Sequence, residues 1–153
     1  MNKIIILLAT GLRSGDLPKA PGTWGTLVSL LLVLFVVPEL LSISPFLYVL
    51  TLLTFIVLSM WIADKAEKLL EQKDAPRIVI DEMAGFLVAT FYLPTTWWVI
   101  LLAFILFRAG DILKPFPVRW CQENLKGGVG IVFDDVVAGI YTCLLLHIVL
   151  LIL

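Results

Sequence analysis

Charged residues are scarce in this sequence, and their scarcity argues against most soluble proteins. Only 15% of the 153 residues are charged, whereas 61% are hydrophobic and the mean hydropathy is +1.06. Soluble domains average about 25% charged and about 45–50% apolar residues, and so short a chain has too little interior to bury the excess. A soluble globular enzyme and a disordered segment are therefore both disfavoured, which leaves an integral membrane protein.

Basic residues, cysteine and histidine are also few. The net charge of −1 and the pI of about 5.7 show no basic excess, so we expect no nucleic-acid partner. The two cysteines, Cys121 and Cys143, predict neither a disulfide nor a zinc site, since Cys143 falls in an apolar run. The one histidine, His147, lies deep in the last apolar run, and the sequence contains no P-loop motif. Phosphohistidine and P-loop chemistry are therefore unsupported.

The charges gather in three groups, and the long stretches between and after them are apolar. A helix that crosses about 30 Å of hydrocarbon needs about 20 residues, a length that Ile43–Ala63 and the C-terminal stretch reach or approach. The first 15 residues predict a retained interfacial or short buried helix rather than a cleaved leader. The apolar stretches are Trp24–Pro38, Ile43–Ala63, Met83–Phe107 and Val136–Leu153.

The third apolar stretch predicts a hairpin. All Lys and Arg fall in the three charged groups, so the positive-inside tendency places these groups on the cytoplasmic side. The stretch must then leave and return, and Pro94 supplies the break between legs at Ile78–Leu93 and Thr96–Arg108. The alternative is one 25-residue span over Met83–Phe107, with the two flanking loops on opposite faces.

The predicted fold is therefore an all-α, polytopic membrane helical bundle. It has about four to five membrane segments, including the hairpin at 78–108, and a polar active site at the cytoplasmic face. We expect one membrane-embedded domain over residues 1–153. The sequence does not determine the oligomeric state.

Two pairs of carboxylates, Asp81–Glu82 and Asp134–Asp135, each open an apolar segment. A small residue stands four positions after three of these acids: Gly85 after Asp81, Ala138 after Asp134 and Gly139 after Asp135. Residues four apart share a helical face, and small residues let another helix approach, so Asp81 is expected to point into a helix–helix seam. A Gly-rich turn at Gly127 and Gly128 could present N–H groups to an anion. The alternatives are a helix-dipole preference for Asp81 and Glu82 and an N-cap role for Asp134.

Cations lie near these acids. Arg108, Asp111 and Lys114 are three residues apart and line one helical stripe, which predicts either an ion pair or phosphate donors beside a ligand. In the turn before the first span, Thr23 and backbone N–H groups could hold an anion, although Trp24 also fits an interfacial anchor. Carboxylates of this kind suit Mg²⁺ and a substrate phosphate, and such cations suit a phosphate dianion.

The sequence resembles the phosphatidylglycerophosphatase A family of bacterial membrane lipid phosphatases. The likeness runs in order through Pro18–Gly25, Ile80–Gly85, Phe107–Pro117 and Gly127–Gly139. It implies Mg²⁺-dependent hydrolysis of phosphatidylglycerophosphate to phosphatidylglycerol and phosphate, with membrane lipids as partners. It also implies a multi-pass protein of the bacterial inner membrane whose active site faces the cytoplasm.

The resemblance places the family's acidic positions on Asp81, Glu82, Asp111, Asp134 and Asp135 and its basic positions on Arg108 and Lys114. The other candidates below follow from the sequence pattern. We expect Asp81, Asp134 and Asp135 to bind Mg²⁺, and Glu82 and Asp111 to act as ligand, base or nucleophile, so that all five are candidate catalytic and metal-binding residues. Two alternatives are a non-catalytic lipid- or ion-binding membrane protein and a different metal-dependent phospholipid enzyme. The expected substrate-binding residues are Lys19, Thr23, Arg108, Lys114, Arg119, Gly127 and Gly128.

Overall fold

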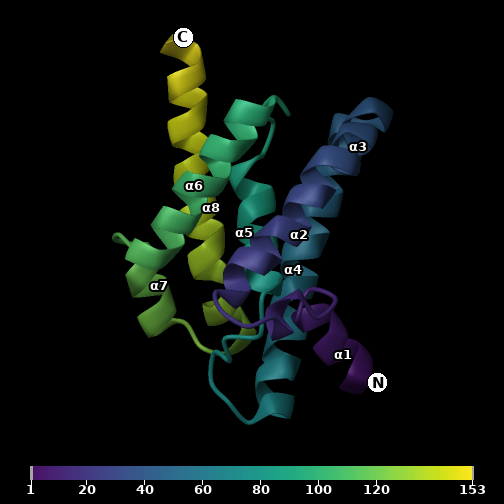
Figure 1. The fold of residues 1–153 in the computed structure, drawn as a ribbon, viewed down its shortest axis with the longest axis vertical. Helices are drawn as coiled ribbons and strands as arrows, with labels where there is room; N and C mark the ends of the chain where they lie inside the picture. The colour runs from purple at the N-terminus through teal and green to yellow at the C-terminus, as the bar shows by residue number, and fades with distance from the viewer. Residues whose placement is uncertain (1, 153) are drawn as a thin grey trace.

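Helices account for all the regular structure in the computed structural model, which describes residues 2–152 and contains no strand over that range. Three stretches are long and apolar enough to cross a membrane: α2 with α3 (Pro21–Phe35 and Val37–Ile43), α4 (Pro45–Leu70) and α8 (Gly127–Ile152). In Figure 1, α8 runs along one side of the bundle and α2, α3 and α4 run along the other, with α5 between them. The all-α prediction is confirmed. The shorter elements are α1 (Asn2–Ala9), η1 (Ser14–Asp16), α5 (Ile80–Ala89), α6 (Trp97–Leu113) and α7 (Val118–Asn124).

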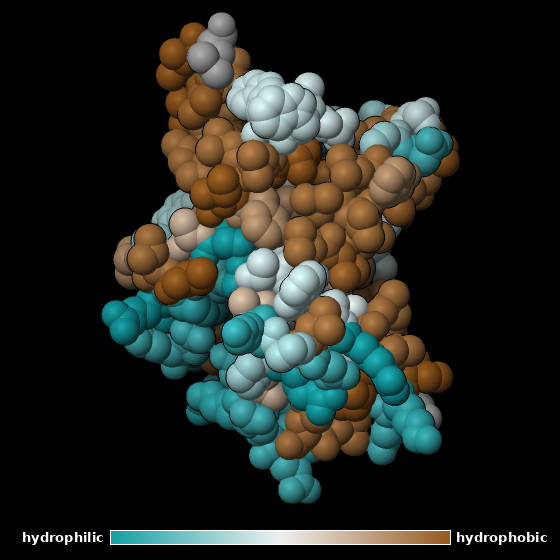
Figure 2. Space-filling view, viewed as in Figure 1, coloured by the Kyte–Doolittle hydropathy of each residue, from teal (hydrophilic) through white to brown (hydrophobic). Residues whose placement is uncertain are grey.

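The surface divides along the long axis of the molecule. Hydrophobic residues cover the upper part and hydrophilic residues gather at the lower end, around α7 and the end of α4 (Figure 2). Large apolar side chains stand open, among them Phe35 at 70%, Phe46 at 76% and Trp97 at 78% exposed. Exposed apolar surface on this scale marks contact with a membrane or a partner, so the fold supports a membrane protein with one polar end.

The predicted hairpin is present as the two helices α5 and α6, separated by residues 90–96. The first leg ends early, at Ala89, where the Thr90 hydroxyl donates to the Phe86 carbonyl at 2.9 Å and Tyr92 turns at φ 54°. The second leg runs past Arg108 to Leu113 because Pro115 is the first residue that cannot continue it.

The loops on either side of the hairpin meet at the polar end. The Gln122 side-chain amide donates to Asp74 Oδ2 at 3.3 Å, which joins α7 to the loop after α4. A single straight span over Met83–Phe107 would hold these loops apart, so that alternative is wrong. At 10 and 17 residues, α5 and α6 fall short of the three long stretches.

The small helix α5 lies at the centre of the bundle and packs against α8, α2 and α4. Its contact with α8 is backbone to backbone: a Cβ added to Gly139 would lie 2.3 Å from the Gly85 carbonyl oxygen, and one added to Gly85 would lie 2.7 Å from that of Asp135. The predicted small-residue seam is thus confirmed, and it aligns the start of α5 with the acidic turn of α8.

Candidate active site

Three carboxylates converge where α5 meets α8. Asp81 and Glu82 lie in the first turn of α5, and Asp135 lies in the interior of α8; one oxygen from each falls within 4.8 Å of the other two. Asp81 is 8% exposed and Asp135 is 3% exposed. Because α8 begins at Gly127, Asp134 is no N-cap, and that interpretation is wrong. Asp81 and Glu82 do lie in the first turn of α5, where the helix dipole favours negative charge, so that alternative is consistent with the structure.

The carboxylates fit a divalent cation. Asp81 Oδ1, Glu82 Oε2 and Asp134 Oδ1 are buried and accept no hydrogen bond from the described part of the chain. Burying a polar oxygen without a partner is costly, and like charges this close disfavour one another's ionised form. A cation bound between the carboxylates would relieve both costs, and an all-oxygen donor set suits Mg²⁺.

Two cations border the same acids. Arg108 Nη1 lies 2.7 Å from Asp111 Oδ2 and 3.9 Å from Glu82 Oε1. Lys114 Nζ lies 2.7 Å from Asp134 Oδ2 and 3.8 Å from Asp111 Oδ1. The predicted stripe is confirmed, and it forms a network of ion pairs that reaches both acidic pairs.

Lys114 keeps its charge in this network. Burial lowers the pKa of Lys114, but the hydrogen bond to Asp134 and the surrounding carboxylates outweigh burial, and the net pKa is raised. The charge is therefore held throughout the neutral range and is lost only as the pH rises above the usual lysine pKa of about 10.4.

A cavity of about 230 Å³ lies against these groups. It is lined by all five predicted carboxylates and by Lys114, and Arg108 borders it through its ion pairs. With Asp74, six carboxylates line the cavity against two cations, and this leaves an excess of negative charge that a metal would offset. Arg108 Nε is buried beside these groups and has no hydrogen-bond acceptor among the described residues.

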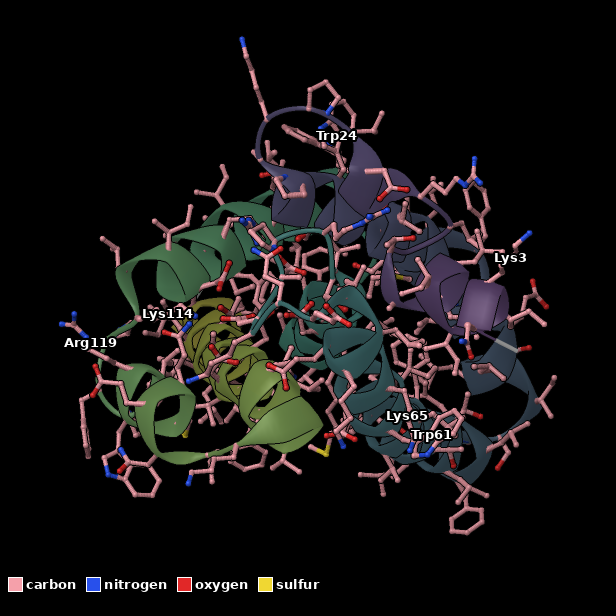
Figure 3. All side chains as sticks on the ribbon, turned by 90° about the horizontal axis from the view of Figure 1, so that it is seen from below. Lys3, Trp24, Trp61, Lys65, Lys114 and Arg119 are labelled. Atoms are coloured by element: carbon pink, nitrogen blue, oxygen red, sulfur yellow. The ribbon has the colours of Figure 1, made fainter. Side chains whose placement is uncertain are left out.

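Three predicted phosphate contacts lie outside this cavity. Lys19 is exposed, and its carbonyl accepts a hydrogen bond from Trp24 Nε1 at 3.2 Å. Thr23 is half-buried in the first turn of α2. The side chain of Arg119 is 75% exposed, pairs with Glu123 at 3.3 Å and points away from the bundle (Figure 3).

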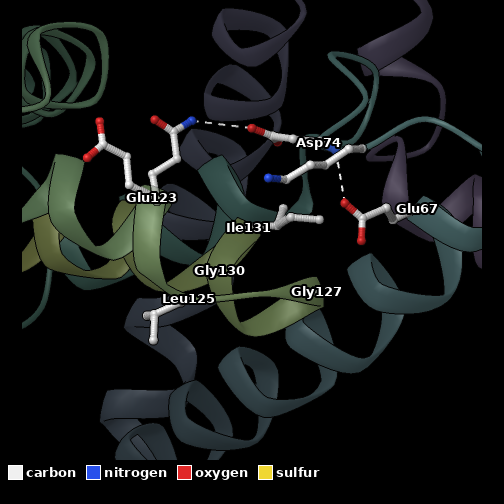
Figure 4. A pocket seen from close by; sticks show the side chains of 9 residues that line it. Glu67, Asp74, Glu123, Leu125, Gly127, Gly130 and Ile131 are labelled. Carbon is white, nitrogen blue, oxygen red and sulfur yellow. Dashed lines mark hydrogen bonds between the residues drawn. The ribbon is translucent and has the colours of Figure 1, made fainter.

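The Gly-rich segment is helical rather than a turn. Gly127–Gly130 form the start of α8, and a Cβ added to Gly128 would lie 1.7 Å from the Met60 carbonyl oxygen. Gly128 therefore allows α8 to approach α4. Gly127 instead lines a second cavity of about 460 Å³ beside the first, together with Glu67, Asp74 and Glu123 (Figure 4).

Two residues of the site were missed by the sequence analysis. A Cβ added to Gly22, at the start of α2, would lie 2.1 Å from Glu82 Oε1 and 3.0 Å from the Arg108 guanidinium nitrogens. Asp74 lines both cavities, and its backbone N–H donates to Glu67 Oε1 at 3.0 Å. Gly22 was missed because the proline before it indicated only a turn. Asp74 was missed because it lies in a charged loop whose sequence has no helical periodicity.

Comparison with known proteins identifies the family. A family model described as phosphatidylglycerophosphatase A matches residues 7–150. Phosphatidylglycerophosphatase A of Haemophilus influenzae is 42% identical over 90% of this chain and 83% of its own length, and that of Escherichia coli is 34% identical over 92% and 80%. A Bacteroides thetaiotaomicron protein with the provisional name phosphatidylinositol-3-phosphatase is 37% identical over 92% and 90%.

No solved structure matches the chain. The family match covers the acidic turn of α5, the cationic end of α6 and the acidic turn of α8, so the residues that form the cavity are within it. The resemblance inferred from the motifs is confirmed: the chain belongs to the phosphatidylglycerophosphatase A family.

Proposed function

We propose that this chain is a single-domain, Mg²⁺-dependent lipid phosphatase that hydrolyses phosphatidylglycerophosphate to phosphatidylglycerol and phosphate. The observation that carries the proposal is the convergence of Asp81, Glu82 and Asp135 within 4.8 Å, with Arg108 and Lys114 beside them. The family supports the activity, since two relatives are named for it. The apolar surface and polar end support a lipid substrate with a charged headgroup.

The geometry favours a revised division of roles. Asp81, Glu82 and Asp135 would hold Mg²⁺, which when bound neutralises phosphate oxygens and activates the attacking group. Asp134 instead pairs with Lys114 at 2.7 Å, so its main role would be to orient that cation. Arg108 and Lys114 would bind the phosphate through charge-assisted hydrogen bonds. Asp111 lies between both cations and would hold them in place or act as base or nucleophile.

The substrate fits this location in the bilayer. A phosphomonoester headgroup reaches the polar end of the bundle while its acyl chains stay beside the apolar helices. We propose a bacterial inner-membrane location with the cavity facing the cytoplasm. All Lys and Arg lie in the charged segments between the apolar stretches, and the positive-inside tendency places such segments on the cytoplasmic side.

Phosphate release from the purified protein in detergent tests the activity. With Mg²⁺ we expect rapid release from phosphatidylglycerophosphate, and with EDTA we expect release to fall to background and recover when Mg²⁺ is restored. Phosphatidic acid and phosphatidylinositol 3-phosphate serve as comparison substrates, the latter because of the Bacteroides relative. Release that is unaffected by EDTA would contradict the metal role, and preference for another substrate would contradict the proposed specificity.

The topology has a separate test. Single cysteines at Gln72 and Glu123, both exposed, are introduced into a chain in which Cys121 and Cys143 are replaced by alanine. A membrane-impermeant maleimide should label both in inverted vesicles and neither in intact spheroplasts. Labelling of the two positions from opposite sides would contradict the hairpin, and labelling of both from outside would reverse the proposed orientation.

A further inference from the structure

A groove lies between α1, the end of α4 and the segment that leads into α5. Its volume is about 580 Å³, and it is separate from both cavities at the carboxylates. Three cations, Lys3, Arg13 and Arg77, line it together with the apolar side chains of Leu7 and Leu69. In Figure 3, Lys3 and Lys114 lie on opposite sides of the molecule, so this groove is not part of the carboxylate site.

The groove carries unbalanced positive charge. Asp16, its one carboxylate, accepts a hydrogen bond from Arg77 Nη2 at 2.5 Å and offsets that cation. Lys3 and Arg13 form no ion pair within residues 2–152. Two uncompensated cations over an apolar floor are complementary to an anionic group that is attached to a hydrocarbon chain.

Apolar side chains stay exposed on α1 and in the turn that follows it. Ile4 is 62% exposed, Leu8 is 42% exposed and Leu12 is 68% exposed. A short helix with an open apolar face and flanking basic residues lies in the interface, with its apolar side in the acyl region. Lys3 and Arg13 would then stand at headgroup depth.

The groove and the carboxylate cavity are connected through residues 76–79. The Val79 N–H donates to the Ala9 carbonyl at 2.9 Å. This hydrogen bond joins the end of α1 to Val79, which lies two residues before Asp81. Arg77 faces the groove while its neighbours Pro76 and Ile78 line the carboxylate cavity. One short segment thus contributes to both sites.

We propose that this groove binds the phosphate headgroup of an anionic phospholipid other than the substrate molecule in the active site. Lys3 and Arg13 contact the phosphate, and Leu7 and Leu69 contact the upper acyl chain. Binding a lipid phosphodiester in this way needs no metal, only cations at the interface, and each cation is worth about fivefold in affinity near an anionic surface. The proposal concerns lipid binding and stands whether or not the chain hydrolyses phosphatidylglycerophosphate.

Photocrosslinking in liposomes tests the site without using activity. The full chain is reconstituted with a trace of phosphatidylglycerol that carries a photoreactive group near the headgroup, and adducts are mapped by mass spectrometry. We expect adducts on residues 2–13 that excess phosphatidylglycerol displaces and excess phosphatidylcholine does not. In Lys3→Gln/Arg13→Gln, the phosphatidylglycerol concentration that displaces half of the probe should rise at least tenfold.

The matched control is Lys65→Gln/Lys68→Gln, which removes two exposed cations from the end of α4 outside the groove. It should retain the wild-type displacement curve. The proposal is overturned if the groove variant also retains that curve, if the control loses as much as the groove variant, or if phosphatidylcholine displaces the probe equally well. It is also overturned if inorganic phosphate alone displaces the probe, because the groove would then recognise a free anion.

Discussion

Asp135→Asn should lower kcat/KM for phosphatidylglycerophosphate by at least about a hundredfold. Replacing even an outer-shell partner of a metal typically costs about 10–100-fold, and Asp135 supplies one of three carboxylate oxygens within 4.8 Å. Asparagine keeps the size of the side chain but removes the charge. The same loss is expected for Asp81→Asn and, through release of Arg108 and Lys114, for Asp111→Asn.

The fold should survive these changes, so a loss of rate can be attributed to the site rather than to unfolding. Without a bound cation the clustered carboxylates oppose one another's ionisation, so removing one negative charge should leave thermal stability in EDTA equal to or above that of the wild type. Adding Mg²⁺ should raise the thermal stability of Asp81→Asn and Asp135→Asn less than that of the wild type. A ligand stabilises the native state in proportion to how tightly it binds that state, and these variants should bind Mg²⁺ more weakly.

Glu123→Gln is the control for these variants. Glu123 is an exposed carboxylate whose ion pair with Arg119 lies outside the carboxylate cavity, and surface pairs of this kind contribute little. Its rate should stay within about twofold of the wild type, in line with that small contribution. Near-normal rates in all three aspartate variants would contradict the site, and an equal loss in Glu123→Gln would indicate a general effect on folding or solubility.

The sequence alone predicted the features that depend on local pattern. Backbone groups in lipid must be satisfied within the segment, so long apolar runs can only be helices, and these runs were visible without a structure. The spacing of Asp81 and Gly85 predicted that one face of this helix carries a carboxylate and a close contact with another helix. In the structure that contact is made by Gly139 of α8. The stripe of Arg108, Asp111 and Lys114 was visible for the same reason.

Features that depend on which helix packs against that face could not be predicted. Helical spacing identifies a face but not its partner, so Asp134 and Asp135 were equally good ligand candidates until the packing turned Asp134 toward Lys114. Gly128 matched an anion-binding turn in composition, but its lack of a side chain serves contact with Met60 on a helix more than 60 positions away. Gly22 is the clearest example, because only the tertiary structure brings it to Glu82.

Gly22→Ala should lower kcat by about a hundredfold while the protein remains folded. The new Cβ would lie 2.1 Å from Glu82 Oε1, too close for any real contact, and 3.0 Å from two nitrogens of Arg108. The clashing atom is the end of a flexible side chain, so the carboxylate can swing aside at little cost to the fold. A displacement of about 1 Å from the productive geometry can cost about a hundredfold in rate. Alanine is also a better helix former than glycine by about 1 kcal/mol, so a thermal melt in detergent should show no destabilisation.

Gly110→Ala is the matched control, since it adds the same methyl group to α6 between Arg108 and Asp111. There the Cβ would meet only Ala138 Cβ, at an ordinary contact distance of 3.8 Å, so the rate should be close to that of the wild type. If both variants lost activity equally, the loss would reflect general helix packing rather than displacement of Glu82. If neither lost activity, the start of α2 would not border the reacting groups. A loss confined to Gly22→Ala would support displacement of Glu82 and Arg108, the two side chains that the new Cβ would meet at the start of α2.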